Sequence, residues 1–168
     1  QFIFGPRAGA KTSEFGYPSQ LPPGLLQQLI PIRILSVETL RADCMEGLCW
    51  NNQQYQSGSW CEQIDAGESE TLARYDNGEP AIVRQGRTTY IGTLTNREFL
   101  LDFFQQYCQQ AGVPTYRFGE NIRVSQRGDL LFAFNYSAEP KKMPLDKDAE
   151  LILGSAIIEP HGVTVWRS

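Results

Sequence analysis

Histidine is nearly absent from this sequence, and the cysteines are few and widely spaced. The 168 residues include one histidine, His161, and four cysteines, none of which form a C-x-x-C pair. Because a structural zinc site needs closely spaced ligands of these types, the sequence predicts no metal site. A net charge of −4 without a basic stripe argues against a nucleic-acid partner. No apolar run approaches the roughly 20 residues that span a bilayer, so no membrane partner is expected.

The short motifs of catalysis are also missing. There is no G-x-S-x-G, and the loop at 5–13 (GPRAGAKTS) lacks both glycine spacings of phosphate-binding loops, although its cations and hydroxyls could hold an anion. His161 follows Pro160 in a turn and is expected to be exposed. The sequence therefore predicts no catalytic residue and no cofactor. Five glutamates in polar, turn-rich stretches are expected to be solvated surface rather than an acid–base pair: Glu46, Glu62, Glu68, Glu70 and Glu79.

The four cysteines, Cys44, Cys49, Cys61 and Cys108, are most simply explained as buried free thiols. A disulfide among the first three is the alternative if the protein is secreted, and metal binding is the third. We expect a cytoplasmic location, with a secreted or periplasmic one as the alternatives.

What is present is the composition of a globular protein, with 41% hydrophobic and 20% charged residues. Its most informative stretch is 73–112. Ala81–Val83 and Thr88–Leu94 are rich in β-branched and aromatic residues and predict two strands joined by a turn at Gly86. Thr95 and Glu98 then form a T-x-x-E capping box. The helix that follows carries one apolar stripe and ends at Gly112. The stripe comprises Leu100, Leu101, Phe103, Phe104, Tyr107, Cys108 and Ala111.

The flanking segments predict an α/β half and a β half. Before residue 73 the patterns favour strands at 2–4, 33–40, 60–64 and 70–75, and a short helix at 25–30. A chain that opens in a buried strand is interpreted as a piece of a longer protein. After Gly112 the pattern predicts a small antiparallel module with a core of Ile122, Val124, Leu131, Ala133, Leu151, Ile157 and Val163. We place the boundary near residue 116, giving domains 1–116 and 117–168.

Three aromatic residues, Trp50, Tyr55 and Trp60, lie in or beside a polar stretch that predicts a hairpin or a long loop. Aromatic side chains in such a setting can anchor a protein interface or stack on a sugar ring. They can equally fill the core beneath the loop. These residues are therefore candidates for interface or sugar contact, with a core role left open.

Several motifs occur in an order that resembles the C-terminal part of the β-galactosidases of glycoside hydrolase family 42. FIFGPRAGAKT resembles that family's strand and G-P-R-[ST]-G-x-K-[TD] loop, with Ala8 in place of the hydroxyl residue. LPPGLLQQLIPIRI, WCEQIDAGESETLARYDNGEPAIVRQ and RTTYIGT are similar to later segments of the same domain. NIRVSQRGDLLFAFNYSAEP and IIEPHGVTVW resemble the closing pattern of the family.

The resemblance implies a partial flavodoxin-like, amidotransferase-like α/β domain that mediates trimer formation, followed by the small all-β antiparallel domain. It also implies an N-terminal (β/α)8 barrel that carries both catalytic glutamates and cleaves terminal β-galactosides with retention. No position in this sequence matches either catalytic motif. We therefore expect a non-catalytic oligomerisation and accessory part, with the barrel and two further copies as partners. The alternatives are a carbohydrate-binding module and an amidotransferase-like enzyme with a cysteine nucleophile.

Overall fold

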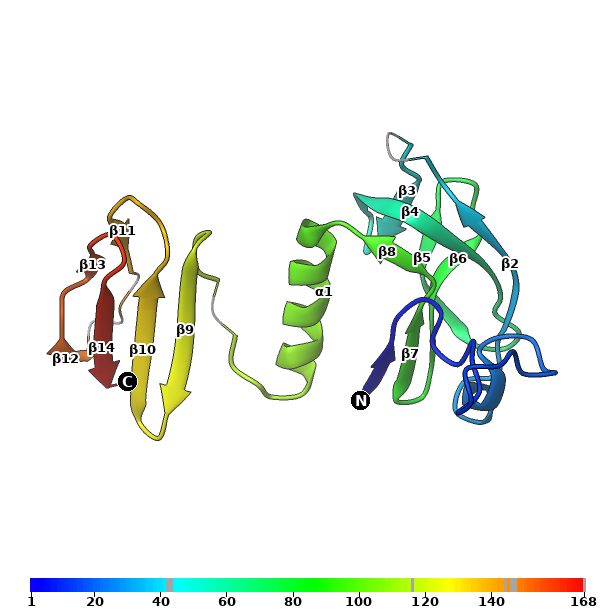
Figure 1. The fold of residues 1–168 in the computed structure, drawn as a ribbon, viewed down its shortest axis with the longest axis horizontal. Coiled ribbons are helices and arrows are strands. Elements are labelled where there is room, and N and C mark those ends of the chain that lie inside the picture. The colour runs from blue at the N-terminus through cyan, green and yellow to red at the C-terminus, as the bar shows by residue number, and fades with distance from the viewer. Residues whose placement is uncertain (42–43, 116, 144, 146–147, 168) are drawn as a thin grey trace. The chain divides into compact units, whose positions relative to one another are not determined.

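The protein is described here from a computed structural model, which covers residues 1–41, 44–115, 117–143, 145 and 148–167. The chain divides into two compact units, Gln1–Pro114 and Thr115–Ser168 (Figure 1). Residue 116, near which the sequence placed the boundary, lies outside the described residues. Each unit is taken by itself below.

The N-terminal unit is built on an eight-stranded sheet with the order β1-β7-β6-β5-β3-β4-β2, in which β8 pairs with β4. Three pairs of neighbouring strands, β3–β4, β5–β6 and β6–β7, are joined by tight hairpins; Gly86, for example, turns the chain between β6 and β7 with a φ of +56°. The strands are β1 (Phe2–Phe4), β2 (Arg33–Thr39), β3 (Gly47–Trp50), β4 (Gln53–Asp65), β5 (Glu70–Tyr75), β6 (Pro80–Gln85), β7 (Thr88–Ile91) and β8 (Thr93–Thr95).

Gly92 is the point at which this sheet turns back on itself. Its N–H donates to the Ala81 carbonyl at 2.9 Å, and its own carbonyl accepts from the Glu62 N–H at 2.8 Å. A Cβ at Gly92 would lie 2.7 Å from Ile64 Cδ1, so a side chain at this position would push Ile64 of β4 aside. Since β8 continues β7 past Gly92 and pairs with β4, the sheet curls around its core.

The prediction of a flavodoxin-like α/β domain is wrong. Among the described residues the N-terminal unit has one α-helix, α1 (Arg97–Gln110), and one parallel strand pair, β1 with β7. The remaining ladders of the unit are antiparallel. A doubly wound sheet needs a long crossover after each strand, whereas hairpins leave no room for crossover helices. The unit is therefore mostly β, with a short 3-10 helix, η1 (Gly24–Gln28), where the sequence predicted a helix.

Helix α1 begins one residue later than the capping box predicted. The side chain of Asn96, not that of Thr95, accepts the Phe99 N–H at 3.0 Å. The C-terminal prediction is confirmed, because Gly112 has a φ of +69° and the Val113 N–H donates to the Cys108 carbonyl at 2.8 Å.

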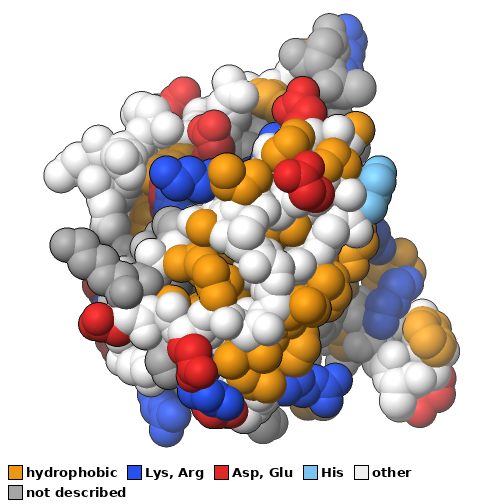
Figure 2. All heavy atoms as spheres, turned by 90° about the vertical axis from the view of Figure 1, so that its left-hand side faces the viewer, with side chains coloured by type: hydrophobic (Ala, Val, Ile, Leu, Met, Phe, Trp, Pro, Cys, Tyr) orange, Lys and Arg blue, Asp and Glu red, His pale blue; other side chains and the backbone are white. Residues whose placement is uncertain are grey.

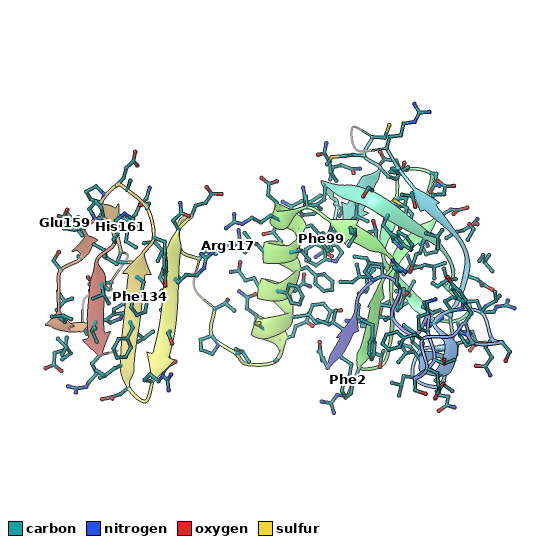
Figure 3. All side chains as sticks on the ribbon, viewed as in Figure 1. Phe2, Phe99, Arg117, Phe134, Glu159 and His161 are labelled. Carbon is teal, nitrogen blue, oxygen red and sulfur yellow. The ribbon has the colours of Figure 1, made fainter. Side chains whose placement is uncertain are left out.

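The buried face of α1 differs from the predicted stripe, which did not include Phe99. Phe99, Phe103 and Tyr107 are buried, at a spacing of four residues. Leu101 and Phe104 instead remain 41% and 44% exposed. Figure 3 shows Phe99 pointing from the helix toward the strands of the same unit. The sheet therefore covers only the Phe99 side of the apolar arc.

The C-terminal unit consists of a four-stranded sheet of order β12-β14-β10-β9 and the pair β11–β13, all antiparallel. Buried Asn135 ties its loops together: Nδ2 donates to the carbonyls of Glu139, Ile158 and Glu159, and Oδ1 accepts from the Ser137 N–H. The strands are β9 (Ile122–Arg127), β10 (Leu130–Asn135), β11 (Lys141–Lys142), β12 (Glu150–Leu153), β13 (Ile157–Ile158) and β14 (Val163–Arg167).

The core of this unit differs in part from the prediction. Ile122, Leu131 and Ala133 are buried as expected. Leu151 and Ile157 are 45% and 53% exposed, and the sequence placed both of them inside. Their places in the core are taken by Met143, Ile158 and Trp166.

Candidate interaction surface

Two of the three aromatic candidates lie in the core of the N-terminal unit. Trp50 and Tyr55 are 6% and 8% exposed and flank the β3–β4 hairpin turn, where the Asn51-Asn52 pair has positive φ angles. The Phe99 ring lies 5.5 Å from the Trp50 ring and 5.3 Å from the Tyr55 ring, both in edge-to-face geometry. Within this unit, therefore, the two side chains join the hairpin to α1.

Trp60, on β4, is the candidate that keeps some exposed surface. The Arg7 guanidinium lies over its ring, with Cζ 4.9 Å from the ring centroid. Its indole Nε1–H donates to Glu62 Oε1 at 3.1 Å. Trp60 thus connects β4 to the loop that follows β1.

Glu62 is the residue that sequence reasoning placed most wrongly, since it is 2% exposed rather than solvated. Besides Trp60, it accepts the Arg7 backbone N–H on Oε1 at 2.9 Å and the Tyr90 hydroxyl on Oε2 at 2.8 Å. Burial, and next the charge of Glu62, raise the pKa of the Tyr90 hydroxyl, which stays a donor at neutral pH. Because both oxygens already accept hydrogen bonds from the protein, this carboxylate acts as a structural anchor.

A close backbone contact between Gly9 and Pro23 also holds this loop, two residues after Arg7. Gly9 has a φ of +71°, and a Cβ built on it would lie 1.9 Å from the Pro23 carbonyl oxygen. A Cβ on Gly24 would in turn meet the Gly9 carbonyl oxygen at 2.7 Å. Only glycine permits so close an approach of two backbones. Residues 10–23 therefore leave and re-enter the unit at nearly the same point, as an Ω-loop does.

This loop, which we call the 10–23 loop, presents aromatic side chains to solvent. Phe15 and Tyr17 are 84% and 83% exposed, and Leu25 of the adjoining η1 is 77% exposed. The loop is braced internally, because the Phe15 N–H donates to the Thr12 carbonyl at 3.0 Å and Lys11 Nζ lies 3.3 Å from the centre of the Tyr17 ring. Beside it lies a mainly apolar hollow of about 450 Å³, lined in part by Phe4, Ala8, Pro18, Leu25 and Leu26.

A small acidic hollow of about 140 Å³ is lined in part by Glu62. Glu38, Glu46 and Glu79 line it together with buried Cys61 and Tyr75. No basic side chain lies among its described lining residues, and no group of three or more described His, Cys, Asp or Glu residues is arranged to hold a metal ion. Burial, followed by the neighbouring Cys61, raises the pKa of the Tyr75 hydroxyl.

The remaining candidates are scattered. All four cysteines are thiols that form no disulfide; Cys61 is buried, Cys44 is exposed, and the other two are half-buried. His161 is exposed, as predicted, in a turn closed by the Gly162 N–H on the Glu159 carbonyl (Figure 3).

No helix in the described part of the chain is long and apolar enough to cross a membrane.

The C-terminal unit has an exposed apolar group of its own (Figure 2). Leu151, Ile152 and Leu153 of the edge strand β12 are 45% to 56% exposed, and Ile157 is 53% exposed. No described residue of the unit covers this strand on its outer side.

Two family models match the chain. Residues 1–114 match the β-galactosidase trimerisation domain, and residues 121–168 match the β-galactosidase C-terminal domain. Together the matches account for nearly all of the sequence, and the first alone spans more than half.

Curated relatives agree with these matches. The chain is 32% identical over 164 residues to a β-galactosidase of Thermus thermophilus, covering 98% of this chain and 25% of the relative. Over 97% of the chain it is 24% identical to the β-galactosidase BgaH of Haloferax lucentense, of which 26% is covered. The chain therefore spans about a quarter of the length of the curated relatives it matches.

Solved structures show the same fold. The β-galactosidase of the psychrophilic Marinomonas ef1 matches 99% of this chain with 25% of its own, at a TM-score of 0.91 and 30% identity. The enzyme of Bacillus circulans sp. alkalophilus gives a TM-score of 0.83 at 22% identity, over 99% of this chain and 29% of its own. Together with the order of the motifs in the sequence, these matches show that the chain belongs to the β-galactosidases of glycoside hydrolase family 42 and carries that family's trimerisation and C-terminal domains.

Proposed function

We propose that this chain is the non-catalytic assembly part of a β-galactosidase whose hydrolytic site lies in an N-terminal barrel outside these residues. The observation that carries the proposal is the coverage, since nearly the whole chain aligns with about a quarter of each relative. The site geometry is consistent with it. Among the described residues Glu62 is the most deeply buried carboxylate, and both of its oxygens already accept hydrogen bonds, from Arg7, Trp60 and Tyr90.

The activity arm of this proposal is tested with the purified 168-residue chain and a chromogenic β-galactoside. We expect no hydrolysis above the buffer blank at enzyme concentrations up to the micromolar range. Turnover that follows the protein through purification, and that a Glu62→Gln variant abolishes, would overturn the proposal, because it would place a catalytic carboxylate inside this chain.

The assembly arm is a homo-trimer, which the matched trimerisation domain supports. A single heterologous interface that closes on itself produces a ring of this kind. Sedimentation velocity over a concentration series should give a species of three times the 19.0 kDa chain mass. A monomer at all concentrations would contradict this arm while leaving the activity arm in place.

A carbohydrate-binding role is favoured by one observation only, the partly exposed ring of Trp60. Titration with galactose or lactose would quench Trp fluorescence saturably if this ring stacks on a sugar, and the Trp60→Phe variant would lose the signal. We expect no saturable quenching, since Arg7 already lies over the ring. Saturable quenching in the parent chain would favour the binding role.

A further inference from the structure

We infer that the surface formed by Phe15, Tyr17 and Leu25 binds a second copy of this chain, as the contact through which the trimer forms. This inference rests on the proposed assembly function and gives that function a location. The surface comprises the tip of the 10–23 loop and the first turn of η1; Ser13 and Pro18 of the loop and Leu25 of η1 line the same hollow. It is named the loop surface below.

Exposure sets the loop surface apart from the other apolar groups of its unit. Phe15, Tyr17 and Leu25 are 77% to 84% exposed. The apolar residues on the outer side of β2, Leu35 and Val37, are 52% and 43% exposed. Two neighbouring aromatic rings this open to water are unusual on a monomer, whereas aromatic residues are enriched at the centres of interfaces.

The backbone holds these rings in place before any partner arrives. The Glu62 anchor and the Gly9–Pro23 clamp fix the base of the loop, and the Thr12 hydrogen bonds close its tip. Phe15 has a φ of +61°, a conformation that bulky side chains rarely adopt. Strained positions of this kind cluster at binding sites, where a rigid surface loses little entropy on association.

The shape of the region suits contact between copies. The Phe15 ring is 84% exposed, and Ser13, two residues before it, helps to line the hollow of Phe4 and Pro18. A chain that carries both a projection and a recess can insert its projection into one neighbour and receive that of another, and such a heterologous contact can close a ring of identical subunits. A second copy is the occupant we assign because the family model that spans these residues is a trimerisation domain.

The test compares two double variants of the full 168-residue chain. Phe15→Ser/Tyr17→Ser removes both rings of the loop surface, and Leu35→Ser/Val37→Ser, the control, removes a smaller exposed apolar area from β2 of the same unit. Truncating a central aromatic commonly weakens an interface at least tenfold, so the loop variant should raise the trimer dissociation constant about a hundredfold. The β2 variant should stay within about threefold. Near-ultraviolet circular dichroism verifies that both remain folded.

A direct readout accompanies the variants. With p-benzoylphenylalanine in place of Phe15, illumination should produce covalent oligomers of this chain, and mass spectrometry should place the cross-link within residues 1–30 of another copy. If the wild-type chain is trimeric and the loop variant equally so, the inference is overturned while the assembly function stands. If the wild-type chain is monomeric, the assembly function fails and the inference fails with it. Cross-links to residues far from the loop surface would also overturn it.

Discussion

Replacing Glu62 should show whether this buried carboxylate holds the loop that carries the exposed aromatics. In Glu62→Ala, three hydrogen-bond donors lose their acceptor: the Arg7 N–H, the Trp60 indole N–H and the Tyr90 hydroxyl. The Tyr90 ring is fully buried and its hydroxyl is left unsatisfied, which costs about 1–3 kcal/mol. The other two donors are part-buried and contribute roughly 0.5–1.5 kcal/mol each before water reaches them.

The expected destabilisation of Glu62→Ala is therefore about 2–6 kcal/mol, a large share of the stability of a small domain. Glu62→Gln is the matched control. Its amide oxygen can keep the two bonds made by Oε1, and its amide NH2 can donate to the Tyr90 hydroxyl, which then turns to accept. The glutamine variant should lose no more than about 1–2 kcal/mol, the added strength of a charged acceptor.

Two measurements check these values. Urea denaturation followed by circular dichroism gives the free energy of unfolding of each variant. Hydrogen exchange then reports the Arg7 amide, which should lose protection in the alanine variant before the sheet does. An alanine variant within 0.5 kcal/mol of the wild type would refute the anchor role, as would a glutamine variant equally destabilised.

Three further outcomes are expected. Asn135→Ala should lower the free energy of unfolding of the C-terminal unit by about 2–4 kcal/mol, because three carbonyls and two donors lose their partner. Trp166 fluorescence in a urea titration measures this loss, and an unchanged midpoint would contradict it. Asn96→Ala should cost about 0.5–2 kcal/mol through loss of the helix cap, measured by thermal unfolding, whereas Asn96→Ser should restore most of it. The raised pKa values of Tyr75 and Tyr90 add stability that is complete below pH 10 and is lost as the pH rises above 10 toward their folded pKa values. The urea midpoint should therefore fall steeply above pH 10, and less steeply in a Tyr75→Phe/Tyr90→Phe variant. If the midpoints of the two proteins fell in parallel, the expectation would be contradicted.

Local chemistry was enough to predict individual elements from the sequence. The turn at Gly86 and the C-terminal stop at Gly112 were both found, because each needs a positive φ that glycine supplies without strain. The helix start was placed one residue early, since Thr95 and Asn96 are both good caps and only the path of β8 decides between them. Strand and helix type followed from residue pattern.

The sheet architecture depended on contacts that no local pattern records. A strand, a turn, a strand and a helix suggested an α/β domain, yet β7 pairs in parallel only with β1, more than 80 residues away. Glu62 is similar. It shares one side of β4 with Trp60 and Ile64, an alternation that was available as a signal. Its burial, however, depends on Arg7, from the loop after β1, and on Tyr90 of β7, both distant in the sequence.

The sequence by itself determined the family, through the order of its motifs, and most of the secondary structure, because these depend on neighbouring residues. Tertiary structure alone decided which apolar side chains are covered. Phe103 is buried and Phe104 is not, and Trp50 lies in the core while Phe15 faces water, although each is an aromatic ring. The reason is that burial is a property of what packs against a side chain, and in this unit the sheet covers only one side of α1 and leaves the 10–23 loop uncovered.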